Sequence, residues 1–148
     1  MDLEKFKEII KRQDGLSNTL GMEFISTLEP DTCMAQMKVD ERNKQGFGFL
    51  SGGATLALAE NLAGVGSMAL CPDKICVGIN VSGNHVRSVL EGDTVTAYGR
   101  VQHLGKTLHQ WHIEIKDSKG ELISTVQVTN YALSPEKSKQ ARTKISAE

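Results

Sequence analysis

Residues 45–64 read QGFGFLSGGATLALAENLAG, and this stretch determines how the rest of the chain is arranged. It opens as a glycine-rich loop and continues as an almost wholly apolar helical run, in which Glu60 is the only ionisable side chain between Ala54 and Leu70. A helix that is apolar on all sides is normally buried. A buried carboxylate costs several kcal/mol to desolvate unless a partner or a function offsets that cost, so Glu60 is the first functional candidate.

The segments on either side of this helix predict an antiparallel sheet. An amphipathic helix over residues 2–13, with Asp2 as a possible cap, comes first. Alternating apolar residues then predict two strands before the central helix and a four-stranded meander after it. The predicted strands span 20–28, 32–39, 75–89, 94–104, 107–116 and 121–133.

The sequence thus predicts an α+β fold in which one antiparallel sheet wraps around one long central helix. We assign a single domain to residues 1–133 and a polar C-terminal tail to residues 134–148, which we expect to be frayed and outside the core. One helix leaves the far sheet face and the sheet edges poorly covered. We therefore expect the chain to self-associate.

Composition excludes several classes of function. Lys and Arg total 17 and Asp and Glu total 18, so no broad basic surface for nucleic acid is expected. No apolar run reaches the roughly 18 residues of a membrane span, and the N-terminus has no secretory pattern. The cysteines, Cys33, Cys71 and Cys76, are odd in number and form no Cys-x-x-Cys motif. They predict reduced thiols in a cytoplasmic protein, with neither a disulfide framework nor a zinc site.

The order of elements, with Gln45-x-Phe-Gly-x-Leu-x-Gly-Gly-Ala in the loop and Leu58-Ala59-Glu60 in the helix, resembles the hotdog-fold acyl-CoA thioesterases. The resemblance is to the PaaI and 4-hydroxybenzoyl-CoA thioesterase branch. It is strongest for the subgroup that acts on 1,4-dihydroxy-2-naphthoyl-CoA and on misloaded aryl carrier protein in enterobactin synthesis. Two further segments support that subgroup, Asn84-His85-Val86-Arg87-Ser88 and His103-Leu104-Gly105-Lys106.

The resemblance implies a role for each matching residue. Glu60 would attack the thioester or activate water, and Gln45 would help to place the carbonyl group and the water. A backbone N–H of Gly52 or Gly53 would bind the carbonyl oxygen. The resemblance also implies assembly as a dimer or as a homotetramer that is a dimer of dimers, with coenzyme A as part of the substrate and no metal or other cofactor.

Other positions are candidates for contacts with the substrate. The resemblance places His85, Arg87 and Lys106 near the pantetheine and the nucleotide of coenzyme A, and Ser51 and Asn61 are further candidate contacts. Two positions depart from the subgroup. Ser51 stands where it usually has His, and Gly64 stands where it usually has Ser or Thr.

The chemistry of the residues leads to a composite site. A helix N-terminus offers free N–H groups and a positive dipole end, and Gly52-Gly53 would let a carbonyl approach that backbone closely. Glu60 follows Gly53 by seven residues, or ~10 Å along the helix at a rise of ~1.5 Å per residue. A side chain cannot easily span that distance, so we expect Gly52 or Gly53 of one subunit to face Glu60 of the other across a two-fold axis. Such a protein is an obligate homodimer with two sites.

Four other interpretations stay open from the sequence. Glu60 could be a structural acid paired with a donor in the core. Ser51 could be a nucleophile, although its Gly-x-x-Ser-Gly context lacks the Gly-x-Ser-x-Gly spacing. The departures at Ser51 and Gly64 favour a non-catalytic module that binds acyl-CoA or acyl carrier protein. A hotdog hydratase is disfavoured because no histidine precedes His85.

The sequence therefore predicts hydrolysis of an acyl-CoA thioester, with an aromatic acyl group as one candidate. It leaves open whether Glu60 acts as a covalent nucleophile or as a general base.

Overall fold

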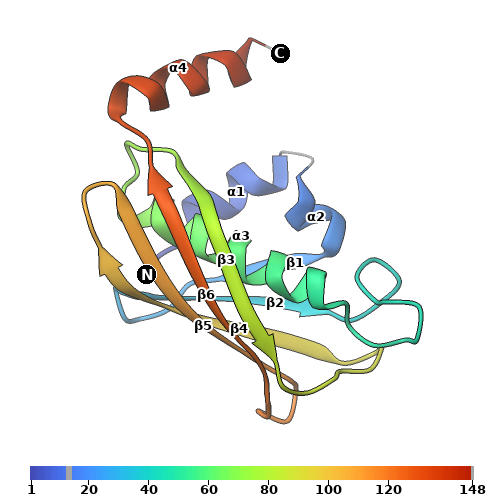
Figure 1. Ribbon diagram of the computed structural model, residues 1–148. Helices are drawn as coiled ribbons and strands as arrows, with labels where there is room; N and C mark the ends of the chain where they lie inside the picture. The colour runs from blue at the N-terminus through green and yellow to red at the C-terminus, as the bar shows by residue number, and fades with distance from the viewer. Residues whose placement is uncertain (13–14, 148) are drawn as a thin grey trace.

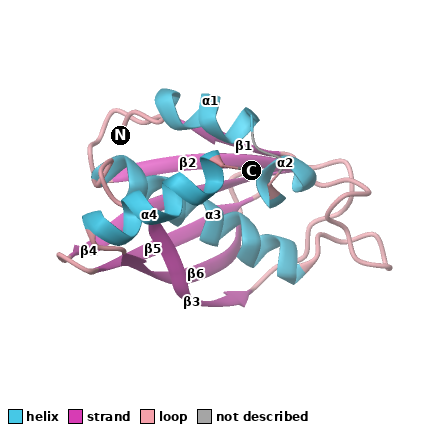
Figure 2. Ribbon diagram, turned by 90° about the horizontal axis from the view of Figure 1, so that it is seen from above, coloured by secondary structure: helices cyan, strands magenta, loops and turns pink. Residues whose placement is uncertain are grey.

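The computed structural model of the protein describes residues 1–12 and 15–147. A six-stranded antiparallel sheet curves around the helix α3 (Gly52–Leu70), with the strands in the order β1-β2-β4-β5-β6-β3 (Figure 1). The strands are β1 (Met22–Ile25), β2 (Thr32–Lys38), β3 (Cys76–His85), β4 (Thr94–Leu104), β5 (Leu108–Lys116) and β6 (Leu122–Ala132). The other helices are α1 (Glu4–Arg12), α2 (Leu16–Leu20) and α4 (Pro135–Ser146). Figure 2 shows α3 lying across one face of the sheet, with α1 beside β1.

The core lies between α3 and this face of the sheet. In β5 every second side chain points at the helix, and Trp111, Ile113 and Ile115 are each 0% exposed. On α3, Leu58 and Leu62 are likewise completely buried. The antiparallel sheet around one central helix is thus confirmed, because strands that alternate with period two present one continuous apolar face to an apolar helix.

A buried polar cluster fixes the rotation of α3 on the sheet. The Trp111 indole lies so close to Gly66 that a side chain at position 66 would collide with it. The indole Nε1–H donates to Ser67 Oγ at 2.9 Å, and Asn130 Nδ2 donates to the same oxygen at 3.0 Å. These contacts join α3 to β5 and β6, so they decide which side of the helix faces β3.

The N-terminal segment differs from the prediction. Residues 20–28 do not form one strand. Leu20 ends the short helix α2, Gly21 follows with φ of 76°, and β1 begins only at Met22. A glycine in the left-handed conformation is a common helix C-cap, and this signal was missed. The predicted cap of α1 is present, since Asp2 Oδ1 accepts the Glu4 N–H at 3.0 Å. Residue 13, the predicted end of that helix, lies outside the described residues.

The C-terminal segment is a helix, so the prediction of a frayed tail was wrong, although none of its described residues belongs to the hydrophobic core, as expected. Ser134 caps α4 by accepting the Lys137 N–H at 3.3 Å. Ser138 is 1% exposed and accepts the Ile75 N–H at 3.0 Å. Arg142 donates to the carbonyl oxygen of Pro72 at 2.9 Å. These bonds dock α4 on the segment between α3 and β3. No helix among the described residues is both long and apolar enough to cross a membrane.

Burial of His109 makes the stability of the fold depend on pH. The side chain is 0% exposed and Nε2 lies 3.8 Å from Cys71 Sγ. Desolvation lowers the pKa of His109 below its ordinary value. The unfolded chain therefore binds a proton that the folded chain excludes, and stability is lost as the pH falls below about 6.5.

We expect the melting temperature of the wild type to decrease between pH 7.5 and pH 5.5, and to decrease less in His109→Gln. The matched control is His112→Gln, which changes an incompletely buried histidine on the same strand and should keep the wild-type slope. Equal slopes in all three proteins, measured by calorimetry, would contradict this account.

Candidate active site

One side of α3 runs along β3, which is an edge strand of the sheet. Gly52, Leu56 and Glu60 are four residues apart and therefore share this side of the helix. Gly83 of β3 faces Leu56 so closely that an added Cβ would lie 3.0 Å from Leu56 Cδ2. The N-terminal end of the helix and Glu60 thus both face the edge strand, about two turns apart.

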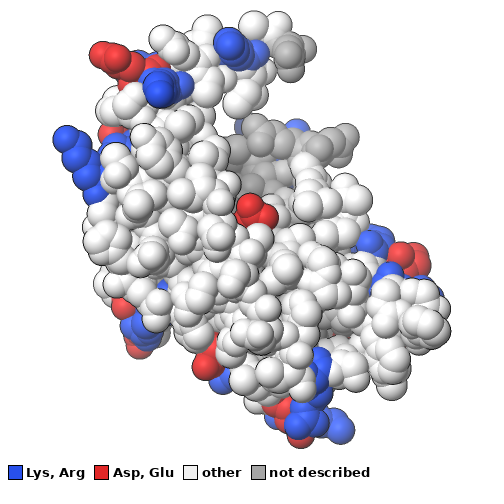
Figure 3. Space-filling model, in the orientation of Figure 1, with Lys and Arg blue, Asp and Glu red and all other residues white. Residues whose placement is uncertain are grey.

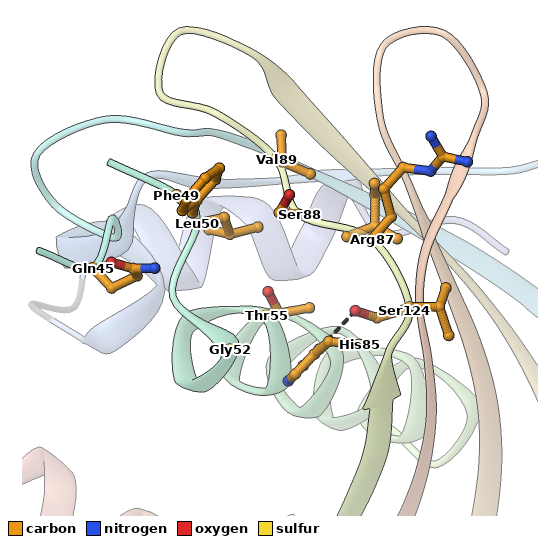
Figure 4. A pocket seen from close by; sticks show the side chains of 12 residues that line it. Gln45, Phe49, Leu50, Gly52, Thr55, His85, Arg87, Ser88, Val89 and Ser124 are labelled. Carbon is orange, nitrogen blue, oxygen red and sulfur yellow. Dashed lines mark hydrogen bonds between the residues drawn. The ribbon is translucent and has the colours of Figure 1, made fainter. Parts of the chain in front are cut away.

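A cavity of about 350 Å³ lies at the start of α3 (Figure 4). Its lining includes Gln45 from the loop before the helix, Gly52 and Thr55 from the first turn, and His85 from the end of β3. The structure thus brings together Gln45, Gly52 and His85, three of the residues singled out from the sequence.

The side chain of Gln45 is oriented by its own loop. Its Oε1 accepts the Phe47 N–H, and its backbone N–H donates to the carbonyl oxygen of Phe49 at 2.8 Å. Because the carboxamide oxygen is engaged, the Nε2 amide group is the part of Gln45 that is available to donate to a ligand.

The first turn of α3 offers backbone donors. Within the described part of the chain, the N–H groups of Gly52 and Gly53 make no hydrogen bond, and the first turn contains no acidic residue. Ser51 is the N-cap residue, but its hydroxyl makes no cap hydrogen bond and does not line the cavity. A carbonyl oxygen that develops negative charge would find donors and the positive end of the helix dipole here.

Arg87 and Lys106, the two basic residues expected to contact coenzyme A, do not line the same cavity. Arg87 lines the cavity, but its side chain extends away from Gly52, and Nη1 lies 3.1 Å from Glu121 Oε2 (Figure 4). Lys106 lines neither this cavity nor the one around Glu60, and its carbonyl oxygen accepts a hydrogen bond from Lys74 at 3.0 Å.

Glu60 lies in a second cavity, of about 430 Å³. Its walls include the apolar side chains of Ile10, Leu16, Phe24, Val65 and Met68. Glu60 is half-buried rather than fully buried, because the cavity opens to the surface above it. Its carboxylate lies against the backbone of Gly78, and it makes no hydrogen bond or ion pair with any described residue.

The remaining walls of this cavity are small or polar. The side chain of Asn61 already makes one hydrogen bond, since Nδ2 donates to the Ala57 carbonyl oxygen at 2.8 Å. Gly64 leaves open space where a side chain would project. Cys76 also lines the cavity, and burial raises the pKa of its thiol to about 11, so the thiol is neutral near pH 7. Across the described residues, no group of three His, Cys, Asp or Glu side chains is arranged to hold a metal ion.

The two cavities share no lining residue, so one chain does not bring Glu60 to Gln45 and Gly52. Sequence reasoning also missed Ser124, which is 0% exposed and lies 2.7 Å from His85 Nδ1. The available signal was its place on the inward face of β6, where it alternates with Val126 and Val128 as a polar residue in an apolar row.

Comparison with known proteins identifies the class. A family model described as the thioesterase superfamily matches residues 47–124. The 1,4-dihydroxy-2-naphthoyl-CoA hydrolase of Escherichia coli is 41% identical over 104 residues, which are 70% of this chain and 76% of that protein.

Solved structures agree with the family model. A thioesterase of Pseudomonas aeruginosa superposes with a TM-score of 0.81 at 33% identity, covering 90% of this chain and 94% of that chain. Two mutants of a Staphylococcus aureus thioesterase, at 34% and 32% identity, have a TM-score of 0.75 and cover 80% of this chain and 98% of theirs. The architecture is the hotdog fold of thioester hydrolases. The chain belongs to the thioesterase superfamily.

The position of Glu60 depends on the absence of a side chain at Gly78. In Gly78→Ala the new methyl group would occupy the place of the carboxylate and force it to move. We expect thioester hydrolysis to fall by roughly 10²-fold, because small displacements of a reacting group cost about that much. Steady-state kinetics on an acyl-CoA provide the measurement.

The control is Leu108→Ala, which changes a 41% exposed residue of β5 that lines neither cavity and lies outside β3. It should keep wild-type kinetics. Full activity in Gly78→Ala, with an unchanged melting temperature, would show that the contact between Glu60 and Gly78 is irrelevant to turnover.

Proposed function

We propose that the protein hydrolyses acyl-CoA thioesters at two sites in a homodimer, each built from Glu60 of one subunit and the α3 N-terminus of the other. The observation that carries this proposal is the position of Glu60 and Gly52 on the side of α3 that faces β3, in cavities that do not meet within one chain.

The edge strand β3 supports the pairing of subunits. It contains no charged residue, and Val77 and Ile79 are 42% and 57% exposed. In Figure 3 the middle of this face is largely uncharged, and most charged side chains lie at its periphery. Edge strands of monomers usually carry charges or proline that prevent pairing. A second β3 paired antiparallel about a two-fold axis would bring the two α3 helices side by side in opposite directions.

Such a dimer would place the N–H donors at the start of α3 in one subunit opposite the Glu60 carboxylate of the other. The thioester carbonyl would bind at the N–H groups of Gly52 or Gly53, beside the Gln45 amide. Either Glu60 takes a proton from water, whose oxygen attacks the carbonyl carbon, or Glu60 attacks first and water then cleaves the anhydride. In both routes the C–S bond breaks, the sulfur receives a proton, and the products are a carboxylic acid and coenzyme A. The chemistry uses no metal or redox cofactor.

The solved relatives support the assignment of the two side chains. In the Staphylococcus aureus thioesterase, the two mutants replace a glutamine and a glutamate that are 15 residues apart. Gln45 and Glu60 have the same separation in this chain.

The cavity around Glu60 supports an apolar acyl group. Phe24 and Met68 offer the apolar walls that an aromatic ring or an alkyl chain prefers, and Gly64 leaves room beside the carboxylate. The name of the Escherichia coli relative favours an aromatic acyl group.

Replacing Glu60 tests the proposed function directly. Glu60→Gln keeps the size of the side chain but removes its charge and its basicity. We expect kcat to fall by roughly 10²- to 10⁴-fold with the melting temperature and the oligomeric state unchanged. A thiol-release assay over a panel of aromatic and aliphatic acyl-CoAs provides the measurement. Turnover near the wild-type level in Glu60→Gln would refute the assignment, and tight binding by the wild type with no release of thiol would identify a binding module.

A mixing experiment tests whether the site is shared between subunits. Glu60→Gln and Gln45→Ala should each be inactive alone. In a mixed dimer, one site carries both substitutions and the other carries none. An equal mixture, unfolded and refolded together, should therefore regain about one quarter of wild-type activity, because half of the dimers are mixed and each has one intact site. A refolded mixture with no more activity than its components would place both residues in the same subunit's site.

A further inference from the structure

His85 is held at the start of α3 by Ser124, a residue to which the proposed reaction gives no role. Its imidazole lies against Gly52, where an added Cβ would be 2.8 Å from Nε2. On the other side of the ring, Nδ1 lies 2.7 Å from Ser124 Oγ (Figure 4). The ring therefore spans the space between the floor of the cavity and the first turn of the helix.

The hydrogen bond to Ser124 favours one of the two ring nitrogens of His85 as the one that carries the proton. Among the described residues, His85 Nδ1 is the only hydrogen-bond partner of the Ser124 hydroxyl. The hydroxyl is completely buried, and if it only accepted a bond from Nδ1–H its own proton would have no partner among the described residues, so donation to Nδ1 is the favoured arrangement. A neutral imidazole that accepts at Nδ1 carries its proton on Nε2. Nε2 has no partner among the described residues, so an N–H donor is available beside Gly52.

We propose that His85 is a catalytic residue whose Nε2–H donates a hydrogen bond to the thioester carbonyl oxygen, together with the N–H groups at the start of α3, and that Ser124 is the positioning residue that sets its tautomer. The inference rests on the proposed function, because it assigns a third donor to the same oxyanion site.

The placement favours the carbonyl oxygen over the phosphates of coenzyme A. A phosphate contact calls for a charged side chain at the rim of the site, which Arg87 supplies. The contact with the Ser124 hydroxyl instead turns Nε2 toward Gly52, so the N–H of the neutral ring would lie at the start of α3. A neutral donor next to the free N–H groups of the first turn is the arrangement that stabilises a developing oxyanion.

The first test reads the tautomer without substrate. In protein labelled with ¹⁵N-histidine, a two-dimensional ¹H–¹⁵N spectrum at about pH 8, above the usual histidine pKa of about 6.5, should show His85 protonated at Nε2. Ser124→Ala should lose this preference. A wild-type His85 protonated at Nδ1 would overturn the proposal, whatever the activity of the variants.

The second test separates the carbonyl contact from a contact with coenzyme A. His85→Phe should lower kcat on an acyl-CoA by roughly 10²-fold with little change in KM, as expected for the loss of one oxyanion donor. His85→Gln retains an amide donor and should recover part of that loss. Since His85 is exposed, neither variant threatens the fold. A rise in KM at constant kcat, or wild-type kcat in His85→Phe, would overturn the proposal.

The matched control is Gln127→Ala. It removes the side chain that lies 2.8 Å from Nδ1 of another histidine, His112, on the outer face of the sheet. Its kinetics should equal those of the wild type, whereas Ser124→Ala should lower kcat. Equal kinetics in both variants would show that Ser124 has no positioning role. Glu60→Gln separates failure of the proposed function from failure of this inference. Retained turnover in Glu60→Gln would refute the proposed function, but it would not change which nitrogen of His85 is found protonated.

Discussion

The close approach of α3 to the edge strand β3 is the constraint on which the candidate site depends. Three glycines permit it, since a side chain at Gly52, Gly78 or Gly83 would collide with a residue of the opposite element. Close packing gives a fixed distance between helix and strand, and a fixed distance is what a reacting carboxylate requires. The loss of backbone rigidity that glycine brings to a strand is offset here by the neighbouring strand β6, which pairs with β3 from Cys76 to His85 except at an irregularity between Gly78 and Asn80.

The rotation of α3 is set at its other end by polar contacts. Trp111 and Asn130 both donate to Ser67, and the indole fills the space above Gly66. An apolar helix on an apolar sheet could slide or rotate at little cost, because hydrophobic contact is not directional. Hydrogen bonds are directional, and a misplaced Ser67 would leave two buried donors unpaired. The cluster far from the site therefore determines that Glu60 faces β3 rather than the core.

Sequence patterns with a physical period were predictive. The apolar run of α3 and the alternation in β2, β4, β5 and β6 follow from burial on one face, and the prediction placed β4 at Thr94–Leu104, as observed. Features that depend on single contacts were missed or misplaced. Gly21 ends α2 through its left-handed conformation, and α4 is held by Ser138 and Arg142, whose partners are distant in the chain. The roles of Gln45, Gly52 and Glu60 came from resemblance and helix geometry, whereas Ser124 emerged only when β3 and β6 were seen paired.

The surroundings of Glu60 weigh against a purely structural role. A structural acid in a protein interior is retained because a donor compensates the cost of desolvating it, and removing that donor is strongly destabilising. Within the described residues Glu60 has no such donor, and it touches the backbone of Gly78 instead. Its half-buried position at the mouth of an apolar cavity keeps some solvation, which lowers the cost of leaving it unpaired. An unpaired carboxylate next to apolar walls is poorly suited to hold a fold together. It is well suited to meet a group that arrives with the substrate, a water molecule or a thioester carbon, which supplies the missing partner only during the reaction.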